Sequence, residues 1–162
     1  MEKNMETPHR NMKNQPAESE NNSLRFVLGI IIAVTILFIW GHSCLNREDS
    51  ATESAWVMEF IQSIVDWMNI HVVISHHFIR KLAHFLEHAL LGAELTVWCV
   101  YIAGYVSLCE LRMHIWKVWL FVLGVGFMDE TIQIFSDRGS AVADVWLDSF
   151  GGVCGTIVVV IL

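Results

Sequence analysis

Side chains able to bind anions or move protons gather in and beside otherwise apolar stretches of this chain. They are Arg80, Lys81, His84, Glu87, Asp129, Glu130, Gln133, Arg138, Asp144 and Asp148. A histidine that a neighbouring carboxylate orients can act as a general base. Arginine and lysine bind phosphate or carboxylate groups. We therefore predict that these residues form a ligand-binding site. The candidate catalytic groups among them are His84, Glu87, Asp129 and Glu130.

Helical spacing places many of these residues on shared stripes. The pairs three or four residues apart are His84 with Glu87, Asp129 with Gln133, and Asp144 with Asp148. Residues at these spacings lie on the same face of a helix. After the last pair, Gly151 and Gly155 have the small-residue spacing that lets helices in lipid approach closely. The pattern predicts that the helices pack closely next to the predicted polar site.

The elements that carry these residues are predicted to span a membrane. Hydrophobic residues make up 54% of the chain and charged residues only 17%, with a mean hydropathy of +0.49. About 20 apolar residues are enough to cross a hydrocarbon core. The predicted spans are residues 24–40, 82–101, 115–135 and 142–162. We therefore expect an all-α, integral membrane bundle of four transmembrane helices, a multi-pass protein of the cell membrane.

Alternating spans bring the predicted site residues to one membrane face. The start of the second span, the end of the third and the start of the fourth must lie together, and most of the charges lie at those three ends. Lysine and arginine favour cytoplasmic loops, and a weak bias from the basic residues around the first span predicts a cytoplasmic N-terminus. The shared face is then extracytoplasmic.

Two other segments complete the predicted organisation. Residues 1–23 contain both prolines and few large apolar side chains, so they are predicted to be a disordered cytoplasmic tail. Residues 24–162 form the transmembrane domain. Apolar residues at helical spacing between 55 and 69 predict a short amphipathic helix between the first and second spans. This helix is expected either to pack on the bundle or to lie flat at the lipid headgroups.

Other ligand classes have little support in the sequence. No basic patch with interleaved aromatic residues indicates nucleic acid. Histidines on or near the predicted site face match no standard zinc spacing, so they are expected to be solvated or interfacial. These histidines are His42, His71, His76, His77, His84 and His88. We predict no metal site and no cofactor.

The order of the motifs resembles the VanZ-like family of membrane proteins. The matching residues are Arg80-Lys81-x-x-His84-x-x-Glu87, Asp129-Glu130-x-x-Gln133, Arg138, Ser140-x-x-x-Asp144 and Gly151-Gly152-x-x-Gly155. The resemblance covers roughly residues 25 to 160. The family often has Asn where this chain has Asp148, and Tyr where it has His88. The resemblance implies a role in the cell envelope and in teicoplanin resistance, without a settled mechanism.

The sequence leaves three functions open. In the first, the outward polar site engages an anionic membrane lipid, a lipid-linked cell-wall precursor or a lipoglycopeptide antibiotic, whose acyl chain lies against the apolar helices. In the second, the chain is a membrane enzyme that modifies one of these molecules by histidine and carboxylate acid–base chemistry or by metal-assisted chemistry. In the third, the charges only hold the helices together. The oligomeric state is not predicted.

Overall fold

The computed structural model describes residues 15–44, 47–69, 73–102, 108–136 and 142–162. The regular elements in these residues are all helical. In chain order they are α1 (Gln15–Ser43), α2 (Arg47–Trp67), α3 (His76–Val97), the π-helix η2 (Trp98–Ile102), α4 (Leu108–Phe135) and α5 (Val142–Ile161). The predicted all-α class is confirmed.

In the described part of the chain, three helices are long and apolar enough to cross a membrane. The segments that meet this condition are Asn22–Ser43, His114–Phe135 and Val142–Ile161, which correspond to the first, third and fourth predicted spans. The second predicted span corresponds to α3 and η2. Because α3 carries several charged and histidine side chains, it does not reach the same hydropathy. A fourth crossing therefore stays a prediction.

The first helix begins earlier than the sequence predicted. α1 starts at Gln15, so residues 15–23, which were assigned to the disordered tail, continue the helix instead. Extending an existing helix fixes one residue for each hydrogen bond gained, and Pro16 lies in the first turn, where the N–H that proline lacks has no helical partner. Residues 1–14 lie outside the described residues.

The start of α3 is set by a side-chain cap. The Ser75 hydroxyl accepts a hydrogen bond from the Phe78 backbone N–H at 3.2 Å, which satisfies one of the N–H groups that a helix start leaves without a partner. The helix therefore begins at His76, before the predicted boundary at residue 82, and includes Arg80 and Lys81.

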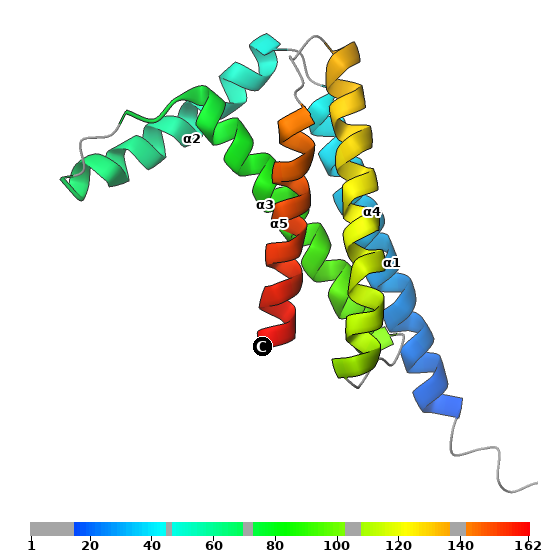
Figure 1. Cartoon of the computed structure of the whole chain (residues 1–162). Coiled ribbons are helices and arrows are strands. Elements are labelled where there is room, and N and C mark those ends of the chain that lie inside the picture. Colours follow the sequence, from blue (N-terminus) through cyan, green and yellow to red (C-terminus); the bar gives the residue numbers. More distant parts are fainter. Residues whose placement is uncertain (1–14, 45–46, 70–72, 103–107, 137–141) are drawn as a thin grey trace, which may run out of the picture.

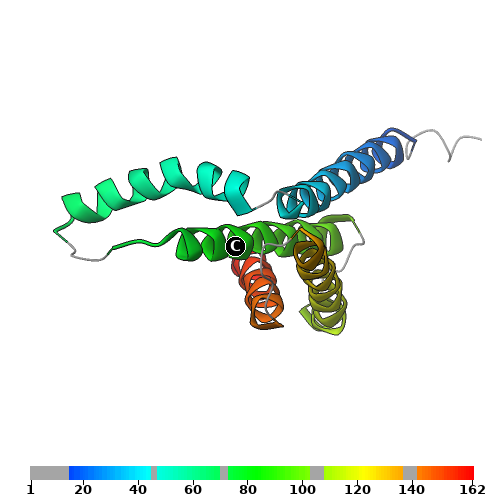
Figure 2. The same cartoon turned by 90° about the horizontal axis from the view of Figure 1, so that it is seen from above.

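The central element of the bundle is α3. Seen from above, α3 lies between α1 and α2 on one side and α4 and α5 on the other (Figure 2). In Figure 1 the end of α1, the end of α4 and the start of α5 lie at the same upper end of the bundle. The start of α1 and the end of α5 lie at the opposite end, as expected for helices that alternate in direction.

Small residues let α3 and α5 pack with their backbones in contact. A Cβ atom added at Gly151 would overlap the carbonyl of Phe85, and one at Gly155 would overlap the carbonyl of Ala89. Gly92 approaches the backbone of Gly152 just as closely. The predicted role of the Gly151 and Gly155 spacing in close helix packing is confirmed.

An apolar core lies beside this crossing. Ile39 of α1, Leu91 of α3 and Val122 and Val125 of α4 form one buried cluster. Because these residues come from three helices, the cluster fixes the distance between α1, α3 and α4 just below the ends that carry the polar residues.

The segment predicted to be an amphipathic helix, residues 55–69, falls mostly within α2, which begins at Arg47 and ends at Trp67; its amphipathic character stays a prediction. α2 contacts α3, yet most of its length projects away from the other helices (Figure 1). Its apolar residues Phe60, Ile64 and Trp67 are exposed, Trp67 by 84%. Asn69 follows with a left-handed backbone (φ 57°), a conformation that asparagine adopts readily after a helix end.

Candidate functional site

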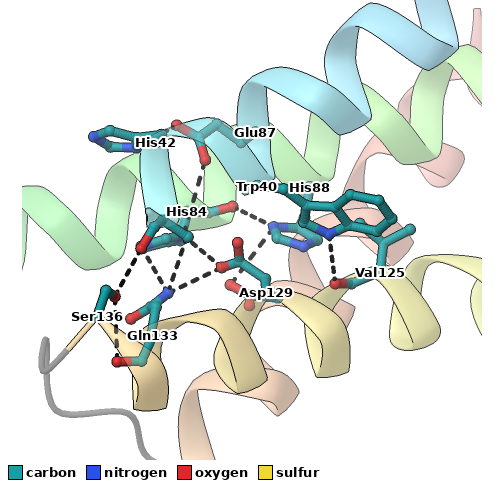
Figure 3. A network of polar contacts seen from close by, with 11 residues as sticks. Trp40, His42, His84, Glu87, His88, Val125, Asp129, Gln133 and Ser136 are labelled. Carbon is teal, nitrogen blue, oxygen red and sulfur yellow. Dashed lines mark hydrogen bonds and ion pairs between the residues drawn. The ribbon is translucent and has the colours of Figure 1, made fainter. Parts of the chain in front are cut away.

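His84 is the centre of a buried polar cluster at one end of the bundle (Figure 3). Its Nδ1 atom lies 3.3 Å from Asp129 Oδ2 and 3.8 Å from Glu87 Oε2. Its Nε2 atom lies 3.4 Å from Gln133 Nε2. The imidazole is therefore oriented from both ring nitrogens, by carboxylates on one side and an amide on the other.

The end of α1 contributes a second histidine to the cluster. His42 Nδ1 lies 3.3 Å from Glu87 Oε1, and the rings of His42 and His84 are 6.0 Å apart between centroids. Glu87 thus lies between two histidines that come from different helices (Figure 3). A carboxylate in this position stabilises either histidine in its charged form.

Hydrogen bonds from Gln133 and Ser136 connect α4 to α1. Gln133 Nε2 donates to Asp129 Oδ2 at 3.0 Å and to Ser43 Oγ at 3.3 Å. Ser136 Oγ donates to the Ser43 carbonyl at 2.9 Å. One turn deeper, Trp40 Nε1 points at the Val125 carbonyl at 3.4 Å. These bonds satisfy polar groups that the helix ends would otherwise bury without partners.

A second polar pair lies deeper, between α3 and α5. His88 Nδ1 donates to the His84 carbonyl at 2.9 Å and lies 3.6 Å from Asp148 Oδ1. Asp148 is only 1% exposed. Among the described residues, neither carboxylate oxygen of Asp148 nor His88 Nε2 has a hydrogen-bond partner. A Cβ added at Gly126 would lie within 3.5 Å of both Asp148 Oδ2 and His88 Nε2, so the glycine makes room for the pair.

The remaining predicted site residues lie at the edge of the cluster or outside it. Lys81 forms an ion pair with Asp144, and its side chain is 34% exposed. Arg80 contacts His77 of its own helix at 3.5 Å and is not brought into the cluster. Glu130 is buried. Arg138 lies outside the described residues.

Among the described residues at this end of the bundle, acidic side chains outnumber basic ones. The acids are Glu87, Asp129, Glu130, Asp144 and Asp148, and the lysine is Lys81. Burying an unpaired carboxylate costs several kcal/mol, roughly, so it needs hydrogen bonds or a counter-charge. Histidines and an amide supply most of the described contacts. The described part of the cluster is therefore richer in hydrogen-bond acceptors than in cationic donors.

Several members of the cluster were not predicted from the sequence. His42 and His88 were expected only to be solvated or interfacial, yet His88 is buried and His42 is in contact with Glu87. The signal for His88 was its position four residues after His84, on the same helix face. Ser43 and Ser136 have no such signal. His76 and His77 are exposed as expected, and His71 lies outside the described residues.

The chemistry that this geometry offers is acid–base chemistry and hydrogen bonding. Within the described ranges, no three or more His, Cys, Asp or Glu side chains are placed to hold one metal ion. The histidine oriented by Asp129 and Glu87 has the arrangement of a general base. The same groups also suit the recognition of hydroxyl, amide or ammonium donors.

Comparison with known proteins places the chain in a family. No curated protein and no solved structure gives a significant match. The family model described as VanZ/LLP1 matches residues 26–162. This range includes α2 to α5, most of α1 and every predicted site residue. The chain belongs to the VanZ/LLP1 family.

Proposed function

We propose that the chain is a multi-pass protein of the cell membrane with four spans, in which α3 and η2 form the second span. The distribution of side chains around α3 supports this proposal. Phe78, Leu86 and Leu90 are each more than half exposed, whereas His84 and His88 are buried. A helix with apolar residues outside and polar residues inside is suited to lipid, although its average hydropathy is low.

A weak bias in the positions of the basic residues supports one orientation of the bundle, although Arg80 and Lys81 lie at the end that carries the polar cluster, where the polar site holds Lys81. Arg25 lies at the start of the apolar part of α1, and Lys117 lies in the first half of α4. The starts of α1 and α4 lie at the end of the bundle opposite the end of α1 and the end of α4 (Figure 1). Basic residues favour the cytoplasmic side. The cluster then lies on the outer side of the membrane, and α2, with Phe60, Ile64 and Trp67 exposed, lies at the outer headgroups.

The function that the site supports best is binding of a lipidated or lipid-linked ligand from the outer face, which protects the cell from teicoplanin. The observation that supports this proposal most directly is the buried cluster of hydrogen-bond acceptors around His84, which lies at one end of otherwise apolar helices. The ligand's hydroxyl and amide groups would donate to Glu87, whose side chain is 14% exposed. Lys81, which is one-third exposed, would bind its phosphate or carboxylate, and the acyl chain would lie against the helices.

The test compares isogenic strains with and without the protein. We expect the protein to raise the inhibitory concentration of teicoplanin more than that of vancomycin, which has no acyl chain. Glu87→Gln should remove most of the protection, because it weakens the contacts with His42 and His84. Glu59→Gln is the matched control, because Glu59 is exposed on α2. Equal protection against both drugs, or equal loss in both variants, would contradict the proposal.

An enzyme is the second candidate, and the geometry of His84 favours it. Asp129 Oδ2 lies 3.3 Å from Nδ1, so a neutral imidazole with its proton on Nδ1 would use Nε2 as the base, where a substrate would replace the 3.4 Å contact with Gln133 Nε2. A positioned general base contributes about 10²–10⁴-fold to a rate. The purified chain would be incubated with labelled phospholipid, lipid-linked precursor or teicoplanin. His84→Gln should abolish product formation and leave ligand binding measurable. If no labelled compound is converted, the enzyme hypothesis is wrong.

A further inference from the structure

A groove lies at the end of the bundle opposite the polar cluster, between α1 and η2. Its volume is about 470 Å³, and its lining residues are Arg25, Phe26, Gly29, Ile30, Ala33 and Trp98. Gly29 precedes His42 by thirteen residues on the same helix, which corresponds to about 20 Å at 1.5 Å per residue. The groove is therefore separate from the candidate functional site.

The shape of the groove comes from one stripe of α1 and from the π-helix. Phe26, Gly29, Ile30 and Ala33 recur at the spacing of one helix face. A Cβ added at Gly29 would lie 3.4 Å from the ring of Trp98. Trp98 is the first residue of η2, a wider helix with a different hydrogen-bond register from α3. The glycine thus leaves space beside the indole that a larger residue would fill.

The chemistry of the groove is amphiphilic. The lining includes one charged side chain, the exposed Arg25, and otherwise apolar groups. From Arg25 to Ala33 the groove follows α1 for about 12 Å, at 1.5 Å per residue. A volume of this size is typical of a site for a small molecule or part of a lipid.

We propose that this groove binds an anionic glycerophospholipid, with its phosphate on Arg25 and an acyl chain along Gly29 and Ala33 against Trp98. Arginine binds phosphate through two parallel N–H donors. Basic pockets between transmembrane helices on the cytoplasmic side recognise acidic headgroups, and the orientation proposed above puts Arg25 on that side. This inference uses the proposed orientation but does not depend on any ligand of the His84 cluster.

The experiment measures lipid retention by native mass spectrometry of the full chain in detergent, with phosphatidylglycerol or phosphatidylcholine added. The chain is expected to retain phosphatidylglycerol in preference to phosphatidylcholine. Arg25→Gln should reduce that preference about fivefold, the effect of one basic residue near an anionic headgroup. Gly29→Leu should displace both lipids from the groove, because the new side chain fills the space beside Trp98.

Gly41→Leu is the matched control on the same helix, because a Cβ at Gly41 meets nothing within 4 Å. It should bind phosphatidylglycerol like the original chain. Gly29→Ala adds a single Cβ in ordinary contact with Trp98 and should retain part of the binding. The proposal is overturned if the chain retains the two lipids equally, or if Gly29→Leu leaves lipid retention unchanged. It is also overturned if the chain forms a dimer that Gly29→Leu abolishes, because a second copy of the chain would then occupy the groove. Teicoplanin susceptibility reports separately on the His84 cluster.

Discussion

At the scale of single residues, the main feature is how much the buried cluster depends on one carboxylate. Asp129 accepts from Gln133 and lies beside His84, and its side chain is fully buried. A buried donor that loses its acceptor costs about 1–3 kcal/mol. The coupling between Asp129 and Gln133 is therefore expected to be larger than that of a comparable pair at the surface.

A double-mutant cycle tests this expectation. Asp129→Ala and Gln133→Ala should each lower the free energy of unfolding by about 1–3 kcal/mol, and together by about 1 kcal/mol less than their sum. The matched pair is Gln62 and Asp66, which has the same four-residue spacing and an exposed hydrogen bond of 2.8 Å. Its coupling should be only about 0.2–0.5 kcal/mol. Thermal unfolding in detergent measures both cycles, and equal coupling in the two pairs would refute the argument.

At the scale of elements, the contact between α3 and α5 determines where the site residues of both helices lie. The backbones touch at Gly92, Gly151 and Gly155, and a hydroxyl pair continues the same contact, with Thr96 Oγ1 lying 3.1 Å from Thr156 Oγ1. Without a hydrophobic driving force between helices in lipid, such close packing and interhelical hydrogen bonds hold them together. The pairs Lys81 with Asp144 and His88 with Asp148 depend on this register.

Gly155→Ala should destabilise the bundle. The added methyl group would overlap the Ala89 carbonyl, and overpacking of this kind costs about 1–3 kcal/mol. Gly124→Ala is the control, because a Cβ at Gly124 meets nothing within 4 Å. Size-exclusion profiles after heating would show a lower melting temperature for Gly155→Ala alone. Similar melting temperatures for both variants would show that the close contact between α3 and α5 does not contribute to the stability of the bundle.

At the scale of the whole molecule, the arrangement predicts which ends are accessible from outside the cell. Cys44 is exposed and follows α1 at the end that carries the polar cluster. Leu162 is fully exposed and lies at the opposite end of the bundle (Figure 1). If the proposed orientation is correct, only the first of these positions faces the medium.

Cysteine labelling in intact cells checks the orientation. In a chain with Cys99, Cys109 and Cys154 replaced by alanine, a membrane-impermeant maleimide should label Cys44 without permeabilisation. When Cys44 is also replaced by serine and Leu162→Cys is introduced, labelling should require permeabilised cells. The reverse pattern would place the His84 cluster in the cytoplasm and would rule out direct contact with an external antibiotic.

Much of the site was predictable because helical periodicity and alternating spans are properties of local sequence. The stripes through His84 and Asp129, and their meeting at one end of the bundle, follow from spacing and from the direction of successive apolar segments. The small-residue spacing at Gly151 and Gly155 likewise predicted the close approach that the structure shows. The helix ends were less predictable. The Ser75 cap of α3 and the start of α1 at Gln15 fall in polar sequence, where no periodic pattern of apolar residues marks a helix.

By itself, then, the sequence determined the helical class, the apolar segments and several of the polar residues that converge, among them His84, Glu87, Asp129 and Gln133. Only the tertiary structure decided which of them touch: Asp148 lies beside the buried His88, Asp144 pairs with Lys81, and Arg80 stays outside the cluster. The end of α1 also adds His42 and Ser43. The reason is geometric, since spacing gives the face of each helix, whereas its rotation and depth are set by backbone contacts with its neighbours.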